Sequence, residues 1–197
     1  MRGGLRSWRG GAPEHRAFEE LLAETLDSLY ATALRLCRGQ SADAEDLLQD
    51  SLLRAFAHRG ELRDAAAGRA WLFTILMRTH LNRVRSGRRR GELIASEMDD
   101  SRFEKALADW SDQDWPDERL EREEARRQIR AAIDALDDEL RQVVILTDFN
   151  GFSQREAAAI VGVPEGTVAS RLFRARRALR DALSAAQRDS TSERRLS

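Results

Sequence analysis

Apolar residues in this chain recur three and four positions apart, a spacing typical of one buried face of an α-helix. Stretches in which apolar and polar residues alternate, the pattern of a half-buried β-strand, are missing from the sequence. Three helices are expected in the first 90 residues, ending near Gly39, near Gly60 and in the arginine run 88–90. The periodicity resumes at Ile129, and the Asn-Gly pair at 150–151 interrupts it again. The sequence therefore predicts an all-α fold.

The second predicted helix has a start signal of its own. Ser41 is expected to cap this helix with its hydroxyl. The helix dipole favours the carboxylates that would then lie in the first turn, those of Asp43, Glu45 and Asp46. A polar loop over residues 60–68 is expected to separate this helix from the third one.

Charge is distributed unevenly along the chain. The formal net charge is only −1, which taken alone would argue against a nucleic-acid partner. Residues 1–90 carry 16 basic and 11 acidic residues, residues 91–124 carry 4 and 13, and residues 125–197 carry 13 and 10. Two basic blocks are therefore separated by an acidic one. All but one of the 33 basic residues are arginine, whose planar guanidinium is suited to phosphate and guanine.

These patterns predict two small helical domains, an N-terminal helical bundle and a C-terminal helix-turn-helix domain. A flexible acidic linker is expected between them, with a short helical piece around residues 103–110. A disordered N-terminal extension and a polar tail are expected to flank them. In chain order, the extension, N-terminal domain, linker, C-terminal domain and tail cover residues 1–16, 17–90, 91–124, 125–184 and 185–197.

Several classes of protein are disfavoured by what the sequence lacks. No run of 18 apolar residues could cross a membrane, and the first residues lack the apolar region of a signal peptide, so we expect a cytoplasmic protein without membrane insertion. Cys37 is the only cysteine and is expected to be a packed thiol, and no Cys/His cluster indicates a metal or another cofactor. No Glu-x-x-His pair, Ser/His/Asp pattern or phosphate loop indicates an enzyme or a small-molecule substrate.

The most specific signal in the sequence lies near its C-terminal end. Ser153 and Glu156 have the spacing of a capping box, so a short helix is expected to begin at Ser153. Ala158, Gly162 and Val168 then meet three separate needs of a helix-turn-helix. The small residue allows close helix approach, the glycine allows a tight turn, and the aliphatic residue packs the second helix on the first.

The second helix of this motif is predicted from about Glu165 to Leu183, with its N-terminal turn in the major groove of DNA. Five arginines and no acid lie between residues 167 and 180, so pairing along the helix does not explain them, although a solvated helix face is the alternative. The residues expected to point largely outward are Ser170, Arg171, Arg174, Arg177 and Arg180. Candidates for contact with base edges are Thr167, Ser170, Arg171 and Arg174. Candidates for contact with phosphate are Arg176, Arg177 and Arg180.

A second concentration of arginine ends the N-terminal domain. Six arginines and no acid lie between residues 78 and 90, which makes a track for a phosphate backbone. Together with the loop before it, this helix has what single-stranded DNA recognition needs, a pocket for an unstacked base and charge to hold the strand. Trp71 is expected to be a core residue, so base capture is assigned to the loop residues Leu62, Arg63 and Asp64. The candidates on the helix are Arg78, Arg83, Arg85 and Arg88.

Three blocks of the sequence together resemble a known family. Residues 43–56 (DAEDLLQDSLLRAF), 70–90 (AWLFTILMRTHLNRVRSGRRR) and 140–180 are similar to extracytoplasmic-function (ECF) sigma factors. These are sigma-70-family subunits that give bacterial RNA polymerase its promoter specificity. A generic helix-turn-helix would explain only the last block. The resemblance implies that the N-terminal domain reads and melts the promoter −10 element and that the C-terminal domain reads the −35 element.

The resemblance also implies partners besides promoter DNA. Residues 43–54 match the helix that docks on the clamp coiled coil of core RNA polymerase, although acids there could simply start a helix. The exposed candidates on this helix are Asp46, Gln49, Asp50 and Arg54. Many relatives carry Asn and Asp in the −10 helix where this chain has Arg78 and Asn82, so Asn82 joins the candidates and the −10 base preference is not carried over. An anti-sigma factor is a further implied partner.

The linker bears on how two DNA sites could be held at once. Promoter elements two helical turns apart lie ~70 Å from one another. A flexible linker of 34 residues has an r.m.s. span of only ~32 Å. The free chain is therefore expected to bind promoter duplex weakly, with core polymerase as the scaffold. The linker's acidity fits either a path through the polymerase interior or a solubilising spacer.

The alternative function for the whole chain is a stand-alone helix-turn-helix transcriptional regulator.

Overall fold

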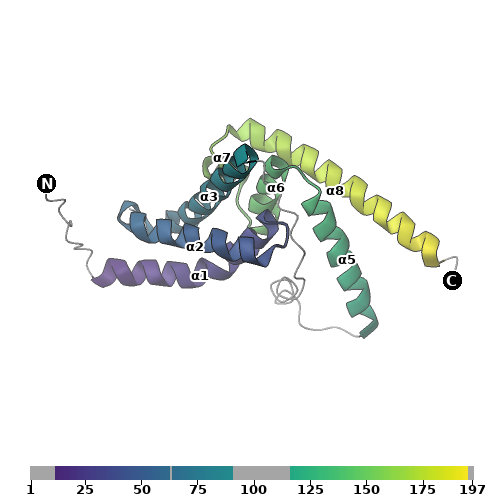
Figure 1. Cartoon of the computed structure of the whole chain (residues 1–197), viewed down its shortest axis with the longest axis horizontal. Coiled ribbons are helices and arrows are strands. Elements are labelled where there is room, and N and C mark those ends of the chain that lie inside the picture. The colour runs from purple at the N-terminus through teal and green to yellow at the C-terminus, as the bar shows by residue number, and fades with distance from the viewer. Residues whose placement is uncertain (1–11, 63, 91–115, 195–197) are drawn as a thin grey trace.

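The structure of the chain is a computed structural model that describes residues 12–62, 64–90 and 116–194 (Figure 1). These residues form helices and turns without a strand, which confirms the predicted all-α fold. In the N-terminal domain the helices are α1 (Ala12–Leu36), α2 (Ser41–His58), η1 (Arg59–Glu61), η2 (Ala65–Ala67) and α3 (Gly68–Arg90). In the C-terminal domain they are α5 (Pro116–Asp134), α6 (Asp138–Val144), η3 (Ile145–Phe149), α7 (Gln154–Val161) and α8 (Glu165–Arg194).

The N-terminal domain is a bundle of α1, α2 and α3, each of which packs on the other two. Leu29, Leu47 and Leu76, one from each helix, are buried in the shared core. The predicted stripes of apolar residues thus form the inner faces of the helices, and burial of these side chains stabilises the bundle.

The start of α2 differs from the prediction by one residue. Gln40, with φ −70° and ψ 102°, is the N-cap, and Ser41 is already the first helical residue and makes no capping hydrogen bond. The cause is the tight turn after α1, in which Gly39 has φ +80° and the Gln40 amide donates to the Cys37 carbonyl. This turn ends early enough for the Gln40 carbonyl to accept the first helical hydrogen bond, from Ala44.

Two helices of the C-terminal domain are longer than the sequence indicated. α5 begins at Pro116, not near residue 125, because proline suits the first helical position, where no N–H group is needed. Acids follow it at once, and they favour a helix N-terminus. α8 continues to Arg194, ten residues past Ser184. The expected helical piece at 103–110 lies outside the described residues. At the other end of the chain, α1 begins at Ala12, before residue 17, where the N-terminal domain was expected to start.

The helix-turn-helix is formed as predicted by α7 and α8. The Ser153 hydroxyl accepts from the Glu156 amide, and the Glu156 carboxylate accepts from the Ser153 amide, so the capping box is complete. Gly162 ends α7 in the left-handed conformation, with φ +77° and ψ 39°. Ala158 and Val168 are buried where the two helices meet. The local signals of the sequence therefore gave this motif correctly.

Replacing each of two glycines of the motif by alanine is expected to change the free energy of unfolding in opposite directions. An alanine Cβ at Gly162 or Gly166 would meet no atom within 4 Å, so neither change is steric. Gly162→Ala is expected to lower the free energy of unfolding by about 1 kcal/mol because φ is positive there. Gly166→Ala, within α8, is expected to raise it by roughly 0.5 kcal/mol because alanine favours helix. Urea unfolding followed by circular dichroism measures both, and equal signs would contradict the assignment of the turn.

The two domains lie against each other. α3 packs on α7, and α1 contacts α6 (Figure 1). Phe73 of α3 and Phe152, just before α7, meet edge to face with 4.9 Å between ring centroids. Buried apolar residues of both domains form one continuous core. The acidic, aperiodic segment between the domains gave no sign of this contact, because the contact is made by side chains far away in the sequence.

Candidate nucleic-acid interface

α8 presents a buried side and an exposed side, as its sequence predicts. Val168, Leu172 and Ala175 are fully buried against the rest of the C-terminal domain. Thr167, at the leading turn, is half-buried, and its carbonyl accepts from the Ser170 hydroxyl at 2.9 Å. The exposed residues among the predicted DNA contacts on α8 are Ser170, Arg174, Arg176, Arg177 and Arg180.

Arg171 does not point outward, and this part of the prediction is wrong. Its side chain is only 12% exposed, and its Nη2 atom lies 2.6 Å from Oε2 of Glu139 on α6. The reason is its place on the helix, three residues after Val168 and four before Ala175, both of which are buried. The stem of Arg171 therefore lies at the edge of the packed face and its charge meets the nearest acid of α6.

Arg176 and Arg177 also have acidic partners within the protein. Arg176 donates two hydrogen bonds to the carboxylate of Asp148 in η3, from Nε to Oδ2 at 3.1 Å and from Nη2 to Oδ1 at 2.6 Å. Burial raises the pKa of Asp148, but hydrogen bonds from Arg176 and Thr147 outweigh it and lower that pKa overall. The Nε atom of Arg177 lies 3.9 Å from Oδ2 of Asp181, which is one turn further along α8 and just past the acid-free stretch.

Phe173 is a feature of this surface that the sequence reasoning missed. Its side chain is 71% exposed, the most among the exposed large apolar residues of the described chain. It lies three residues after Ser170 and four before Arg177, so it shares their outward face. An aromatic ring on an otherwise polar helix face was the available signal. Next to it, Arg174 and Arg180 have no carboxylate partner among the described residues.

α3 presents a stripe of three polar residues at helical spacing. Arg78, Asn82 and Arg85 stand at i, i+4 and i+7, and all three are exposed. Arg83 lies to one side, where its Nη2 atom is 2.6 Å from Oδ2 of Asp50 on α2. The side chain of Arg88 lies outside the described residues. The structure thus places three of the predicted residues together and assigns Arg83 to a contact between helices.

The predicted residues of the loop before α3 also differ in their exposure. Leu62 is half-buried and packs against the core, so its side chain faces away from solvent. Asp64 is exposed, and its Oδ1 atom accepts from the Ala66 amide at 2.9 Å, which starts the short helix η2. Arg63 lies outside the described residues. Trp71 packs edge to face with Phe18 at 6.4 Å between ring centroids, which agrees with its predicted core role.

α2 carries the residues predicted to meet a polymerase. Asp46, Gln49 and Arg54 are exposed, whereas Asp50 is half-buried and already paired with Arg83. Leu53, which the sequence reasoning left out, is 62% exposed. It follows Asp46 and Gln49 at i+7 and i+4, so these three residues form one face. An exposed leucine thus lies beside two polar residues on this face.

The described part of the chain was also compared with three other kinds of feature: a reactive thiol, a metal site and a membrane-spanning helix. Burial raises the pKa of Cys37 to about 12, so this thiol is packed and unreactive near neutral pH. The described residues contain no group of three or more His, Cys, Asp or Glu side chains that could hold a metal ion. Among the same residues, none of the helices is both long and apolar enough to cross a membrane.

The fold and the site define a class of protein, a two-domain helical DNA-binding protein with a C-terminal helix-turn-helix. Comparison with known families narrows this class. Residues 21–90 match the family described as Sigma-70 region 2, and residues 126–179 match Sigma-70, region 4. The chain therefore belongs to the sigma-70 family, among the ECF RNA polymerase sigma factors. A stand-alone regulator would need its N-terminal domain for sensing or dimerisation, and the region 2 match argues against that alternative.

Individual relatives cover most of the chain. The RNA polymerase sigma-H factor of Pseudomonas aeruginosa is 30% identical over 171 residues, 86% of this chain and 88% of that protein. The ECF RNA polymerase sigma factor EcfG of Rhodopseudomonas palustris is 38% identical over 158 residues, 80% of each chain. Among solved structures, the sigma factor RpoE in complex with the anti-sigma factor NepR from Bartonella quintana is similar, with a TM-score of 0.66 and 30% identity. That match covers 85% of this chain and 96% of the solved one.

Proposed function

We propose that this chain binds core RNA polymerase through α2, reads the −35 element with α8, and reads and helps to melt the −10 element with α3 and the loop before it. The observation that carries the proposal is the outward face of α8, where Ser170, Phe173 and Arg174 stand just after a complete helix-turn-helix turn. In this motif the N-terminal part of the second helix enters the major groove.

Each exposed group on α8 has a chemistry that suits part of a duplex. The guanidinium of Arg174 can donate two hydrogen bonds to the O6 and N7 atoms of guanine. Phe173 can contact the methyl group of thymine, and Ser170 can bond to several base edges. Arg177 and Arg180, further along α8, suit phosphate. Arg171 and Arg176 then act as positioning residues, because their pairs with Glu139 and Asp148 fix how α8 is rotated.

On α3, Arg78, Asn82 and Arg85 form the surface that we assign to the −10 strand. Two guanidinium groups along one helix face can follow a phosphate backbone, and the amide between them can hydrogen-bond to a base. Arg83 contributes indirectly, because its pair with Asp50 ties α3 to α2. Asp64 remains the exposed loop candidate for capturing a base, and Arg63, which precedes it in the sequence and lies outside the described residues, stays a candidate.

The function as a whole is tested by transcription. The purified chain is added to sigma-free core polymerase with promoter fragments from its own genome, and run-off transcripts are measured. We expect transcripts that depend on the chain and on both promoter elements. Transcription unchanged by the chain, together with tight duplex binding by the chain alone, would contradict the sigma assignment and favour a stand-alone regulator.

The polymerase face of α2 gives a separate prediction. Asp46→Arg is expected to weaken binding to core polymerase by about tenfold, because it reverses a charge in a protein interface. Leu53→Ala is expected to weaken it by a smaller factor through lost apolar contact. Glu24→Arg, the same reversal at an exposed position of α1, is the control and should change little. Fluorescence anisotropy of the labelled chain measures binding to core polymerase. Equal losses of affinity for Asp46→Arg and Glu24→Arg would contradict the assignment of polymerase binding to this face of α2.

The remaining parts of the proposal follow from this role. The sigma factor in the solved relative is in complex with an anti-sigma factor, and we infer that an anti-sigma factor also binds this chain. We further infer that the chain acts in the cytoplasm beside the polymerase, with no enzymatic activity and no cofactor of its own. Catalysis in this assembly belongs to the polymerase.

A further inference from the structure

Two of the five arginines between residues 167 and 180 pair with acids that lie outside α8. Arg171 pairs with Glu139 of α6, and Arg176 pairs with Asp148 of η3. The two arginines are five positions apart, which is about 140° around a helix axis, so they lie on opposite flanks of the buried side of α8. An acid from another helix thus faces each flank of the helix that we assign to the −35 element.

Asp148 is oriented by its own surroundings. It lies in η3, a π-helical turn in which the Asn150 amide donates to the Ile145 carbonyl five residues back. Such turns are rare and are often found at functional sites. The Thr147 hydroxyl donates to Oδ1 of Asp148 at 2.9 Å, and Arg176 donates to both carboxylate oxygens. The carboxylate is therefore presented to α8 in one orientation.

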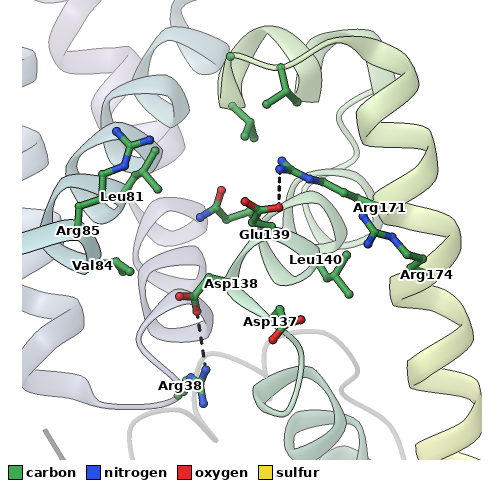
Figure 2. Close-up of a pocket in the computed structure, with 14 residues that line it drawn as sticks. Arg38, Leu81, Val84, Arg85, Asp137, Asp138, Glu139, Leu140, Arg171 and Arg174 are labelled. Atoms are coloured by element: carbon green, nitrogen blue, oxygen red, sulfur yellow. Dashed lines mark hydrogen bonds and ion pairs between the residues drawn. The ribbon is translucent and has the colours of Figure 1, made fainter. Parts of the chain in front are cut away.

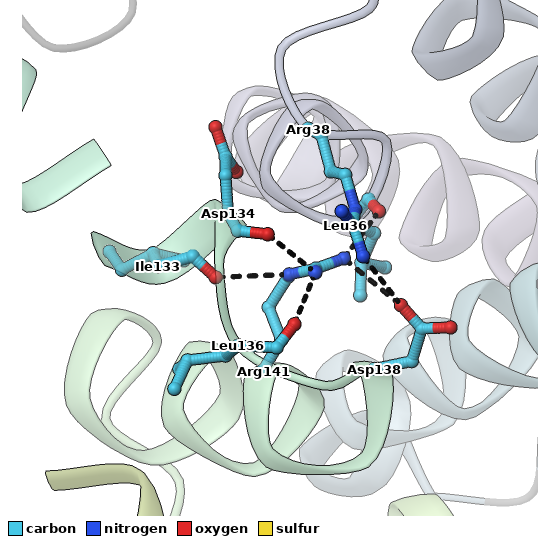
Figure 3. Close-up of polar contacts among 7 residues, drawn as sticks. All are labelled: Leu36, Arg38, Ile133, Asp134, Leu136, Asp138 and Arg141. Carbon is cyan, nitrogen blue, oxygen red and sulfur yellow. Dashed lines mark hydrogen bonds and ion pairs between the residues drawn. The ribbon is translucent and has the colours of Figure 1, made fainter. Parts of the chain in front are cut away.

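Glu139 is oriented through the turn between α5 and α6. Arg141, two residues after it, is 1% exposed, and its three nitrogens donate five hydrogen bonds (Figure 3). One of them reaches the Leu36 carbonyl of the N-terminal domain at 3.5 Å. The acceptors at the end of α5 and the start of α6 are Ile133, Asp134, Leu136 and Asp138. Because these bonds fix the turn, Glu139 meets Arg171 from a fixed position (Figure 2).

A carboxylate and a DNA phosphate are alternative acceptors for the same guanidinium. Arg176 is 52% exposed, so exchanging Asp148 for a phosphate requires only rotation of its side chain. Each phosphate contact changes the slope of log K against log salt concentration by about 0.9, which corresponds to about fivefold in affinity near 0.15 M salt. This contribution is the same for every DNA sequence. The two acids therefore withhold sequence-independent contacts from DNA.

We propose that Glu139 and Asp148 are specificity-determining residues, which compete with phosphate for Arg171 and Arg176 and so weaken binding to non-promoter DNA more than binding to the −35 element. Base contacts need α8 at one rotation, which the pairs maintain, whereas phosphates occur along every duplex. Specificity is a ratio of affinities, so a feature that weakens the wrong complex raises it. This inference rests on the proposed function, which assigns α8 to DNA.

The test measures binding of the full chain to a labelled duplex of random sequence by fluorescence anisotropy, at several salt concentrations and without polymerase. Asp148→Asn keeps the size of the side chain and removes its charge. We expect about fivefold tighter binding near 0.15 M salt and a salt slope steeper by about 0.9, because Arg176 gains a phosphate. Glu139→Gln should act in the same direction by a smaller factor, since Arg171 is largely buried.

Two further variants separate competition from other effects of the change. Asp137→Asn is the matched control, because Asp137 is exposed, lies two residues before Glu139 and makes no ion pair with another described residue. It should change the affinity by less than about twofold, since salt screens an exposed charge. Arg176→Ala combined with Asp148→Asn should abolish the gain, because the gain requires the guanidinium. A merely structural role of Asp148 would not produce this dependence on Arg176.

Competition between −35 and random duplexes for the holoenzyme measures specificity, and Asp148→Asn should lower the preference for the −35 duplex by up to about fivefold. An unchanged preference, an equal gain for Asp137→Asn, or a gain that persists without Arg176 would each overturn the proposal.

Arg180→Ala distinguishes failure of this inference from failure of the proposed function. If Arg180→Ala reduces the salt slope and Asp148→Asn leaves it unchanged, only the competition by Asp148 is refuted. If Arg180→Ala also leaves the slope unchanged, α8 does not contact DNA, and both proposals are refuted.

Discussion

Arg174→Ala is expected to lower the affinity of the holoenzyme for the −35 element by about 5- to 150-fold and to relax the choice of base there. A bidentate contact between arginine and guanine contributes about 1–3 kcal/mol of discrimination, which corresponds to this range. The side chain is exposed and has no carboxylate partner among the described residues, so its loss should leave the free energy of unfolding nearly unchanged. Affinity is measured by competition between duplexes that differ at single −35 positions, at one fixed salt concentration.

Arg171→Ala provides the contrast, since it lies one turn closer to the N-terminus of α8. Arg171 is 12% exposed and paired with Glu139, so its removal should lower stability and weaken binding to all −35 sequences by a similar factor. Arg180→Ala should also weaken binding uniformly and reduce the salt dependence, as expected for a phosphate contact. If Arg174→Ala left base preference intact while Arg171→Ala changed it, our assignment of the two arginines would be reversed.

The helix-turn-helix could be predicted from sequence because each of its signals is local. The capping box needs only Ser153 and Glu156, three residues apart, and the turn needs one residue, Gly162, that tolerates positive φ. Burial of Val168 and Leu172 follows from helical periodicity alone. These signals involve residues within one or two turns of each other, so nothing about the tertiary arrangement had to be known.

The pairing of the arginines could not be predicted in the same way. Arg171 pairs with Glu139 and Arg176 with Asp148, partners 32 and 28 residues away. Periodicity places a residue on a face of its own helix, but it does not say which acid of another helix lies opposite. The count of acids between residues 167 and 180 therefore missed these pairs, and it missed Asp181 by one position.

The contact between the domains was hidden for a related reason. From sequence alone, Arg141 is one more charged residue near the start of a helix, and Asn150 belongs to a turn. Their partners Leu36, Thr32 and Arg69 lie between 81 and 118 residues away. The uneven charge distribution indicated two separate domains, and only the tertiary structure shows that they close on each other.

Arg141→Met is expected to lower the free energy of unfolding by about 3 kcal/mol or more, the largest stability loss among these substitutions. Burial lowers the pKa of the Arg141 guanidinium, and even so arginine stays protonated at neutral pH. Removing it leaves the carbonyls of Asp134 and Leu136, at and just after the end of α5, without their donor, whereas the Ile133 carbonyl keeps the Leu136 amide. Each carbonyl left unsatisfied in the interior costs about 1–3 kcal/mol. Urea unfolding followed by circular dichroism measures the loss.

Arg141→Lys separates charge from geometry in the same experiment. Lysine keeps the positive charge but offers three donors from one nitrogen, so it cannot reach acceptors that surround a planar guanidinium. We expect it to recover less than half of the loss. Arg127→Ala, at an exposed position with one pair within its own helix, should cost no more than about 0.5 kcal/mol. A loss below about 1 kcal/mol for Arg141→Met would show that water or rearranged side chains satisfy those carbonyls, and that Arg141 does not secure the junction of the two domains.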